Sequence, residues 1–410
     1  MNMARNTSAP AGLPSLDIDS ASHLRAMQDY LAYRIQGSEG GFMPFEEWMH
    51  HALYAPGLGY YAAGSTKFGS EAPEGDFTTG PELTPLFGQA LAGQVAQILA
   101  ASGTKNVLEV GAGTGALAAA LIPALNLLDI RPQYQILEVS PELRERQQQR
   151  LGSLHANVQW LKALPSDFKG CVIANEVLDA MPATLFSWDD AGNLLELGVG
   201  LENAAAQQAD ADAPAESSEP PRFKLVERPA DEHLQALMSR RMPPLPGYRS
   251  EVNVQAEAWM RQLGTWLKKG AALLIDYGFP QREFYHPQRA EGTLMCHFRH
   301  HAHADPLLYP GLQDITTHVD FTAMADAALE GGLEILGYTS QARFLMNAGL
   351  IEILTGLDPH DAAGYAKVVG PVQKLLSEAE MGELFKVMAV GRGLDVPLMG
   401  FTSGDRRDRL

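Results

Sequence analysis

One glycine-rich stretch limits the folds that this chain can adopt, because it joins a short apolar run to an apolar helical pattern. Residues 107–110 predict a buried strand, and residues 116–125 predict a helix. Between them, Gly111, Gly113 and Gly115 predict a sharp turn, since glycine allows positive φ and lets the backbone approach a ligand closely. The first turn of the helix has free N–H groups that suit a polar or anionic ligand. A strand, a glycine turn and a helix in this order indicate a nucleotide-binding α/β sheet.

Two kinds of cofactor remain open for this turn. The pattern Gly-x-Gly-x-x-Ala over residues 111–116 is typical of dinucleotide binding, so NAD or FAD is one interpretation. With Glu109 at its head, the same stretch has the Glu-x-Gly-x-Gly-x-Gly pattern of the S-adenosylmethionine (SAM) loop in class I methyltransferases. An acidic residue before the glycines suits a cationic ligand better than a pyrophosphate. A tight turn in an ordinary α/β protein is a third interpretation, because a single glycine motif is weak.

A second acidic residue supports nucleoside binding. Residues 134–139 predict the next strand, and Glu138 lies at its end. Ser140 and Pro141 then suit the N-cap and first turn of a helix. A carboxylate at the end of the second strand can accept hydrogen bonds from ribose hydroxyls. Because NAD and SAM both contain a ribose, Glu138 favours a nucleoside without choosing between the two cofactors.

The composition limits the partners and the compartment. The chain has 410 residues and a net charge of −18, so we expect no nucleic-acid partner, whereas a basic protein or peptide partner is permitted. Two cysteines, Cys171 and Cys296, exclude a disulfide framework and indicate a reducing compartment. No apolar run is long enough to span a membrane, and residues 1–16 resemble a tail more than an organellar presequence. We therefore expect a cytoplasmic protein.

The order of the expected elements predicts an α/β fold with insertions. Strands alternate with helices, and the last two strands, at 333–338 and 384–390, can form the antiparallel hairpin that closes a methyltransferase sheet. This favours a seven-stranded, Rossmann-like class I SAM-dependent methyltransferase fold, with a helical N-terminal segment and an inserted substrate lobe, over a six-stranded dinucleotide fold. The expected divisions are a disordered tail at 1–19, a helical cap at 20–102, a SAM-binding domain at 103–395 with insertions at 184–250, 279–318 and 341–380, and a C-terminal tail at 396–410.

A histidine cluster, His297 to His303, invites a metal interpretation. Its spacing matches neither a zinc ribbon nor a His-Glu-x-x-His helix, and no cysteine pair accompanies it. We therefore expect a polar loop on the substrate side and no metal. No Gly-Lys-Ser/Thr follows the glycine turn, which makes a phosphate-binding NTPase an unsuitable interpretation.

Six motifs occur in one order: Gly75-Asp-Phe-Thr-Thr-x-Pro-Glu82, Glu109-Val-Gly-x-Gly-Thr-Gly115, Asn175-Glu-Val-Leu-Asp-Ala-Met-Pro182, Asp276-Tyr-Gly278, Thr317-His-Val-Asp-Phe321 and Gln341-Ala-x-Phe-Leu345. Together they resemble the MidA-like proteins, relatives of the mitochondrial complex I assembly factor that is a protein arginine methyltransferase. The resemblance covers about residues 40–395. Two departures are Gly80, where relatives tend to have Ser-Pro directly, and an expanded stretch at 203–221. The resemblance implies a class I SAM fold with SAM as cofactor, and its mitochondrial members imply arginine methylation of a respiratory complex I subunit.

An arginine acceptor needs carboxylates, because guanidinium is planar and always protonated at neutral pH. Asn175, Glu176 and Asp179 follow the expected fourth strand, which adjoins the glycine turn in a doubly wound sheet. Glu176 and Asp179 are three residues apart, so one helical turn would place both on the same face. We expect this pair to bind the guanidinium; a helix-capping acid and a solvated acid are the alternative. Asp276 is a weaker candidate, since an aspartate there can simply form a turn.

A polar loop before the sheet is expected to close over the cofactor. Phe77 could cover the adenine or shield the sulfonium, and Asp76 and Thr79 could supply hydrogen bonds. A helix N-terminus capped by Thr79 is the alternative. Two other functions stay open: a nicotinamide-dependent oxidoreductase and a non-catalytic assembly factor. The oligomeric state is also open, and a homodimer is permitted.

Overall fold

The computed structural model describes residues 12–63, 79–154, 156–202, 219–357, 360 and 362–410. Asp76 and Phe77 of the expected cofactor loop lie outside the described residues, as does most of the expected excursion at 203–221. The chain forms two compact units, and each is built from three separate segments of the sequence. The first unit comprises Met1–Phe77, Pro182–Val252 and Ala290–Thr317, and the second comprises Thr78–Met181, Asn253–Arg289 and His318–Leu410.

The first unit combines two helices with antiparallel sheets. Its five-stranded sheet has the order β1-β7-β6-β9, and β8 also pairs with β7. A second, three-stranded sheet has the order β12-β11-β13. The elements are α1 (Ile18–Gln36), η1 (Glu39–Gly41), β1 (Met43–Pro44), α2 (Phe45–Tyr54), β6 (Thr184–Trp188), β7 (Leu194–Leu201), β8 (Phe223–Pro229), α8 (Glu232–Arg241), β9 (Arg249–Val252), β11 (Met295–Phe298), β12 (His301–His303) and β13 (Asp314–Thr316).

One apolar core holds these three segments together. Trp48 of α2 is fully buried and packs in the same cluster as Leu31 of α1, Val199 of β7 and Ile315 of β13. Because these residues come from all three segments, none of the segments has a complete core without the others. The expected helical cap is therefore only part of a mixed α and β unit.

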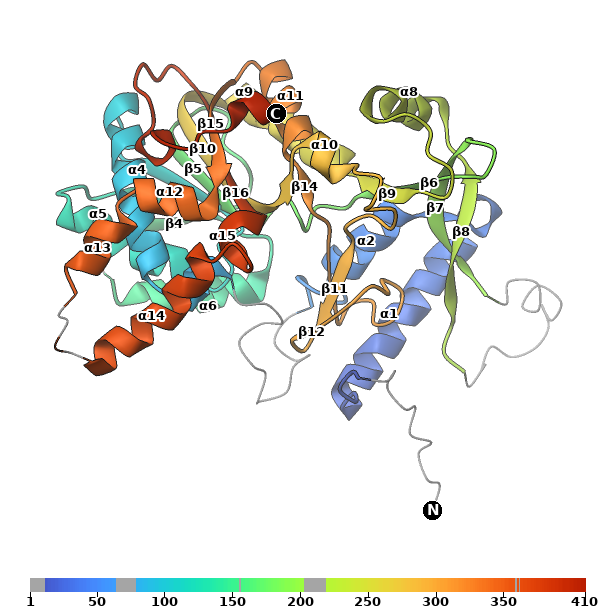
Figure 1. Cartoon of the computed structure of the whole chain (residues 1–410). Helices are drawn as coiled ribbons and strands as arrows, with labels where there is room; N and C mark the ends of the chain where they lie inside the picture. The colour runs from blue at the N-terminus through green and yellow to red at the C-terminus, as the bar shows by residue number, and fades with distance from the viewer. Residues whose placement is uncertain (1–11, 64–78, 155, 203–218, 358–359, 361) are drawn as a thin grey trace. The chain divides into compact units, whose positions relative to one another are not determined.

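The second unit is a mostly parallel sheet with helices on both faces (Figure 1). It begins with α3 (Gly80–Leu83), α4 (Leu86–Ser102), β2 (Asn106–Val110), α5 (Ala116–Leu127), β3 (Gln133–Leu137), α6 (Pro141–Gly152), β4 (Val158–Leu161) and β5 (Phe168–Asn175). It continues with α9 (Val254–Trp266), β10 (Leu267–Phe279), α10 (Gln281–Phe284), β14 (Val319–Asp320), α11 (Phe321–Glu330), β15 (Glu334–Ser340), α12 (Gln341–Asn347), α13 (Leu350–Thr355), α14 (Ala362–Leu376), α15 (Met381–Leu384), β16 (Phe385–Arg392), η3 (Met399–Phe401) and η4 (Arg407–Arg409).

The strand order confirms the expected α/β class. Seven strands run in the order β15-β16-β10-β5-β2-β3-β4, and the short β14 pairs with β10 as an eighth. The strands from β4 to β10 are parallel, whereas β16 is antiparallel to both β10 and β15. The expected closing hairpin is thus formed by β15 and β16. The order reverses at β2, so the ends of β2 and β5 form the switch point where such sheets bind ligands.

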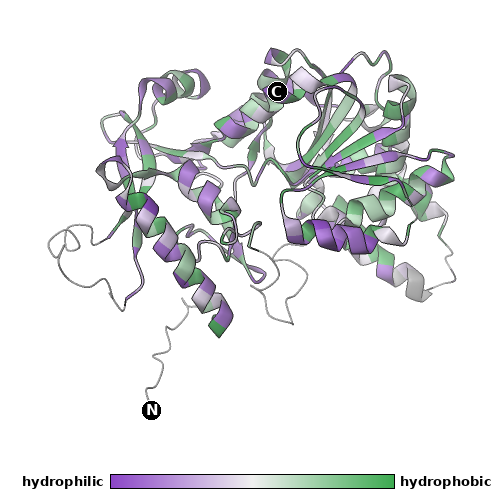
Figure 2. Cartoon of the chain, turned by 180° about the vertical axis from the view of Figure 1, so that it is seen from behind, coloured by the Kyte–Doolittle hydropathy of each residue, from purple (hydrophilic) through white to green (hydrophobic). Residues whose placement is uncertain are grey.

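The sheet is buried on both faces, and neighbouring residues of one strand enter different cores. Val107 packs with α4 and α5, whereas the next residue, Leu108, packs with α9 and α11. In β5, Ile173 packs in the first of these cores and Val172 in the second. Such strands have continuous apolar runs, as expected for a parallel sheet between helices. Figure 2 shows these strands mostly in the green of hydrophobic residues.

Three expected divisions of the chain differ from the structure. Residues 79–102 were assigned to the cap, but α4 packs in one core with α5 and the parallel sheet. The expected insertion at 341–380 belongs to the same core, through Phe344 and Leu375. The expected C-terminal tail also packs there, since Phe401 is buried. Each difference has the same physical cause, which is that an apolar face must be covered by some other part of the chain.

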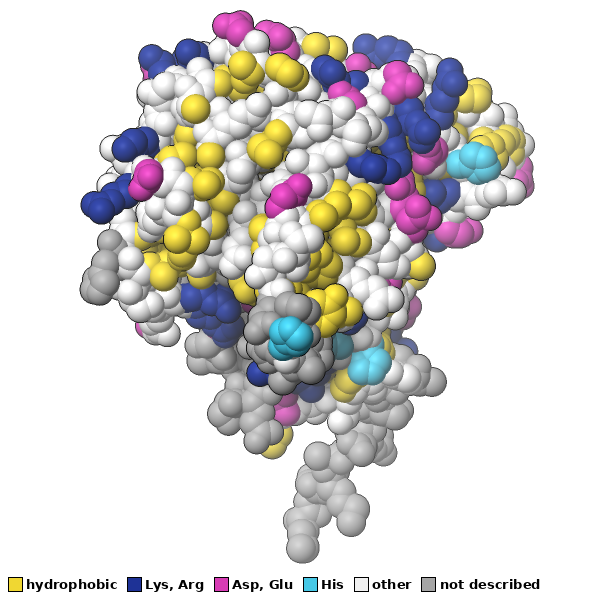
Figure 3. All heavy atoms as spheres, turned by 60° about the vertical axis from the view of Figure 1, so that its left-hand side comes forward, with side chains coloured by type: hydrophobic (Ala, Val, Ile, Leu, Met, Phe, Trp, Pro, Cys, Tyr) yellow, Lys and Arg dark blue, Asp and Glu magenta, His cyan; other side chains and the backbone are white. Residues whose placement is uncertain are grey.

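The surface of the second unit has no strong bias of charge where α5, α13 and α14 lie. Figure 3 brings this side forward and shows acidic, basic and apolar side chains interspersed on it. Among the described residues, no helix is both long and apolar enough to cross a membrane.

Candidate functional site

The glycine turn leaves open space beside its backbone. All three glycines have positive φ, at 65° for Gly111, 53° for Gly113 and 83° for Gly115. A Cβ added at Gly113 would meet no described atom within 4 Å, whereas one at Gly111 would lie 3.0 Å from Cγ2 of Val177. Gly115 directly precedes α5, whose first turn has free N–H groups. The turn can therefore receive a ligand against the backbone of Gly113.

Glu138 lies at the end of β3, beside this turn, and is held by several donors. Its Oε1 accepts a hydrogen bond from Ser140 N at 2.9 Å, and its Oε2 accepts one from Gln147 Nε2 at 3.0 Å. Burial raises the pKa of the Glu138 carboxyl, while these donors and the N–H groups of Val139 and Gly113 lower it. The next side chain, Val139, is exposed and apolar. The arrangement offers an acceptor for ribose hydroxyls next to an apolar surface.

Glu109 is buried inside the sheet. Tyr134 Oη donates a 2.6 Å hydrogen bond to Glu109 Oε2. Burial raises the pKa of the Glu109 carboxyl to about 7, and the nearby charge of Glu138 also raises it. The contacts of Glu109 are thus made with the protein interior, and its role as a cofactor ligand stays a prediction.

The segment after β5 does not form the helical turn expected for residues 176–179. Glu176 has φ = 54°, a left-handed conformation that is rare for a side chain of this kind, and its N–H donates to Ile275 O at 2.8 Å. Asp276 explains the path of the chain, because its buried Oδ2 accepts from Leu178 N at 3.0 Å and from Asp179 N at 3.3 Å. Asp276 is therefore the carboxylate that shapes this segment.

Glu176 and Asp179 have different surroundings. Glu176 is half-buried and accepts a 3.0 Å hydrogen bond from Asn175 Nδ2. Asp179 is buried, and its Oδ2 accepts a 2.6 Å hydrogen bond from Tyr277 Oη. Its Oδ1 makes no hydrogen bond of ordinary geometry among the described residues, although the N–H groups of Ala180 and Asp179 lie close enough to lower the pKa of the carboxyl. Burial raises the pKa of Asp179 to about 6, against the effect of the Tyr277 hydroxyl.

This segment adjoins the glycine turn through Val177, whose Cγ2 limits the space at Gly111. The three residues expected after the fourth strand, Asn175, Glu176 and Asp179, therefore lie on a segment that touches the expected cofactor turn. Their proximity follows from the adjacent parallel strands β2 and β5. Their roles stay predictions.

Further groups surround Tyr277. The His318 ring packs edge-on against Tyr277, with centroids 5.0 Å apart, and against Phe279 at 5.3 Å. Burial and the charges of Arg289 and Lys386 lower the pKa of His318 to about 4, so this ring is neutral at pH 7. Tyr277 and His318 belong to the two short motifs at 276–278 and 317–321, whose chemistry the sequence pattern did not indicate.

The sequence also did not indicate Gln147 or Arg150 of α6. Gln147 is fully buried and bonds to Glu138 and to the glycine turn. Arg150 bonds to Thr114 of the turn and forms a 3.3 Å ion pair with Glu82 of α3. Both come from a helix whose composition is almost wholly polar, so nothing in the sequence separates them from solvated neighbours.

Of the three residues expected in the loop over the cofactor, the structure describes Thr79. Thr79 takes the N-cap position of α3 without a side-chain capping bond. Asp76 and Phe77 lie outside the described residues. Within the described ranges, no group of three or more His, Cys, Asp or Glu side chains is arranged to hold a metal ion.

The fold and this turn define a class I SAM-dependent methyltransferase. The chain belongs to the family described as "Putative S-adenosyl-L-methionine-dependent methyltransferase", whose model matches residues 90–339. The expected fold, cofactor and enzyme class are confirmed by this match, and so is the MidA-like resemblance.

The chain is similar to a solved structure from Burkholderia thailandensis with bound S-adenosyl-homocysteine (SAH). The two are 46% identical with a TM-score of 0.89, over 97% of this chain and 100% of that chain. It is also similar to "Protein arginine methyltransferase NDUFAF7 homolog, mitochondrial" of Drosophila melanogaster, at 26% identity over 88% of this chain and 86% of the relative. The mouse protein of the corresponding name is 25% identical over 95% of this chain and 92% of its own length.

The expected cytoplasmic location is contradicted by these named relatives, which are mitochondrial. The physical reason for the error is that the small number of cysteines indicates only a reducing compartment. The mitochondrial matrix and the cytoplasm share that property, so composition does not separate them.

Proposed function

We propose that this methyltransferase modifies an arginine side chain of a protein partner. The observation that carries the proposal is the buried carboxylate of Asp179, which has one oxygen without a hydrogen bond of ordinary geometry among the described residues and lies on a segment touching the glycine turn. The names of the mitochondrial relatives, which are protein arginine methyltransferases, support the same acceptor.

The residues present suit SAM. The open space at Gly113 can take the cofactor against the backbone, and Glu138 can accept its ribose hydroxyls. The exposed Val139 offers an apolar contact for the adenine ring. When bound, SAM supplies an electrophilic methyl group on a sulfonium. These assignments also make the Glu138 carboxylate the main determinant of nucleoside affinity.

A guanidinium acceptor suits Glu176 and Asp179. A buried carboxylate is costly when ionised unless a cation compensates it. Above pH 6 Asp179 is mostly ionised, so a planar cation next to its buried Oδ1 would lower that cost. Glu176 is half-buried three residues earlier, and both it and Asp179 lie close enough to Asp276 to raise the pKa of that carboxyl. In the proposed complex Glu176 would hold the same guanidinium in line with the methyl group.

The protein residues have a second task, which is to remove a proton. When the new N–C bond forms and the S–C bond breaks, the methylated nitrogen must release one proton. Asp179 is the acceptor of suitable pKa, and the Tyr277 hydroxyl keeps its carboxylate oriented. The MidA-like motifs imply a respiratory complex I subunit as the partner, and a homodimer is a further proposal that light scattering would test.

The test measures methyl incorporation into a complex I subunit from the same cell, with mass spectrometry locating the modified residue. Glu176→Gln and Asp179→Asn each remove one charge and preserve shape. We expect turnover to fall by about 100- to 1000-fold, equivalent to about 3–4 kcal/mol of transition-state stabilisation. SAH affinity should change less than threefold, because its contacts lie elsewhere.

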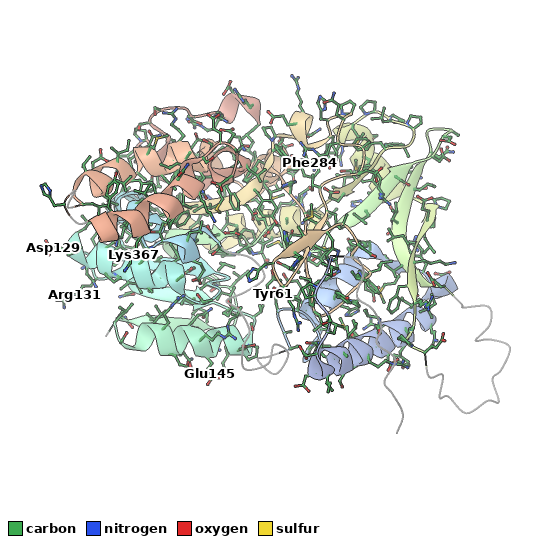
Figure 4. All side chains as sticks on the ribbon, turned by 60° about the horizontal axis from the view of Figure 1, so that its bottom comes forward. Tyr61, Asp129, Arg131, Glu145, Phe284 and Lys367 are labelled. Atoms are coloured by element: carbon green, nitrogen blue, oxygen red, sulfur yellow. The ribbon has the colours of Figure 1, made fainter. Side chains whose placement is uncertain are left out.

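Two matched controls make the same chemical changes at exposed positions. Figure 4 shows Glu145 on the outer side of α6 and Asp129 after α5. Glu145→Gln and Asp129→Asn should retain wild-type turnover. Undiminished turnover in a folded Glu176→Gln, Asp179→Asn double mutant would contradict the site, and a methyl group on lysine or a carboxylate would discard the arginine acceptor. A protein that binds SAM but modifies no complex I subunit would favour the non-catalytic assembly factor.

A further inference from the structure

Gln147 is a buried polar residue on an otherwise polar surface helix. Figure 2 draws α6 almost entirely in the purple of hydrophilic residues. Its buried residues are Gln147 and Leu151. Glu145, two positions earlier, points outward in Figure 4. A fully buried amide must be hydrogen-bonded to be tolerated, so its partners explain why this position differs from its neighbours.

Three structural elements meet at the Gln147 side chain. Its Nε2 donates to Gly113 O at 2.8 Å and to Glu138 Oε2 at 3.0 Å. Its Oε1 accepts from Trp160 Nε1 of β4 at 2.9 Å. The Gln147 Cγ also lies 3.4 Å from where a Cβ of Gly115 would be. The side chain therefore connects the glycine turn, the end of β3 and β4.

Trp160 fixes which way the amide points. An indole N–H can only donate, so the amide oxygen must face Trp160. The NH₂ group then faces the two acceptors, Gly113 O and Glu138 Oε2. A reversed amide would set its oxygen against both acceptors and its NH₂ group against the indole donor. The hydrogen-bond network thus determines the orientation of the amide uniquely.

We propose that Gln147 is a positioning residue for the cofactor, whose amide holds the Glu138 carboxylate and the Gly113 peptide in the arrangement that binds the nucleoside. The inference rests on the proposed role of Glu138 as ribose acceptor. Gln147 does not replace that role; it acts through Glu138. A donor at Oε2 also favours the ionised carboxylate, which opposes the effect of burial on the pKa of Glu138.

Other charged groups near Glu138 also affect SAH binding as pH changes, so their titration must be distinguished from that of Glu138. Glu109 of β2 titrates with a pKa of about 7 and interacts with Glu138, so it overlaps the informative pH range. On α6, Glu142 pairs with Arg146 at 2.6 Å, and Arg150 pairs with Glu82. Because Glu109 is itself a predicted cofactor contact, the SAH affinity of Glu109→Gln is measured first, and each variant is then compared with its own parent in both the wild-type and the Glu109→Gln background, which removes the overlapping titration.

The experiment is calorimetric titration of SAH between pH 5 and pH 8, a range that starts near the ordinary pKa of a glutamate and extends above it, and it needs no methyl acceptor. Gln147→Met keeps the length and removes both donors, and we expect at least tenfold weaker binding at pH 7. The loss should grow as pH falls, since the pKa of Glu138 rises without the amide. Gln147→Glu should show the opposite trend, because only its protonated form can donate to Glu138.

Three controls separate the explanations. Gln148→Met makes the same change one residue later at an exposed position and should bind SAH normally. Glu138→Gln should weaken binding and remove most of the pH dependence. Trp160→Phe leaves Gln147 in place but frees its amide to rotate, so we expect a smaller loss of a few fold. This variant also tests the inference if Gln147→Met does not fold.

The outcomes distinguish the inference from the assignment on which it rests. If Glu138→Gln binds SAH as the wild type does, the ribose role of Glu138 is wrong. If Glu138→Gln weakens binding while folded Gln147→Met and Trp160→Phe do not, the positioning role alone is wrong. The positioning role would also be wrong if Gln147→Met binds SAH more weakly but keeps the wild-type pH profile. That result would indicate a purely structural defect, which leaves the titration of Glu138 unchanged.

Discussion

Replacement of Glu109 by glutamine should stabilise the protein above neutral pH. The Glu109 carboxyl is buried in the sheet, and its pKa of about 7 lies above the ordinary value of 4.5 because burial penalises the ionised form. Below pH 4.5 it is neutral in both the folded and the unfolded state. As pH rises from 4.5 to 7, the unfolded state ionises while the folded state stays protonated, so stability is lost in this window and the loss is complete once the folded state also ionises above pH 7.

The magnitude follows from the two pKa values. Their difference, 7 minus 4.5, at about 1.4 kcal/mol per pH unit, corresponds to about 3 kcal/mol. Glutamine stays neutral and can still accept the hydrogen bond of Tyr134 Oη, which the carboxylate accepts at 2.6 Å. The unfolded state is already partly ionised at pH 5, so the free energy of unfolding of Glu109→Gln relative to wild type should increase by about 2.5 kcal/mol between pH 5 and pH 8.

The assay is equilibrium urea unfolding followed by circular dichroism at pH 5, 6, 7 and 8. Two compact units can unfold separately, so the transition to compare is the one that SAH shifts to higher urea. A gap between variant and wild type that is independent of pH would refute the reasoning. SAH titration of the same variant tests the predicted cofactor contact, since a direct ligand of the cofactor would lose affinity when its charge is removed.

Three further changes test other parts of the second unit. Tyr277→Phe removes the hydroxyl that donates to Asp179, so the pKa of Asp179 should rise above 6. The pH–rate profile of methyl transfer should then move to higher pH, and turnover at pH 7 should fall at least tenfold. An unshifted profile would exclude Asp179 as the proton acceptor. In Gly113→Ala the added Cβ would meet no described atom, but the residue has φ = 53°, so thermal unfolding should show a loss of stability of about 1–2 kcal/mol. SAH binding should weaken more than tenfold, and unchanged binding would place the cofactor elsewhere. Gly170→Ala should destabilise the second unit without a direct effect on the site, because φ is 143° and the added Cβ would lie 2.2 Å from Asn106 O. The strained φ alone accounts for about 1–3 kcal/mol of lost stability. An unchanged melting temperature would contradict this geometry.

The sequence predicted well those features that depend on neighbouring residues. The strand at β2, the glycine turn and α5 form one local unit, whose apolar runs and glycines are visible in a single window. The closing hairpin of β15 and β16 was likewise indicated by two apolar runs near the C-terminus. Separate motifs in one order then predicted the family, which the family model confirms.

The division of the chain into units could not be predicted in the same way. Residues 182–252 and 290–317 look like insertions because they interrupt an alternation of strands and helices. Their apolar residues pack with α1 and α2, far away in sequence. Which helix covers which sheet depends on the complementarity of faces, and periodicity shows only that a face exists.

The sequence by itself determined which residue types stand at the ends of β2, β3 and β5, and hence that the ligand at this edge of the sheet contains a nucleoside. Only the tertiary structure decided what each of those residues does. Glu109 and Glu138 look equivalent as acids beside glycines or strand ends, yet one bonds to Tyr134 in the interior and the other lies beside the turn. In the sequence, nothing distinguishes Gln147 from the other glutamines of a polar helix. In the structure it is buried and donates hydrogen bonds to Gly113 O and Glu138 Oε2. The reason is that burial and hydrogen-bond partners, which set the pKa and orientation of a polar group, are supplied by residues distant in the chain.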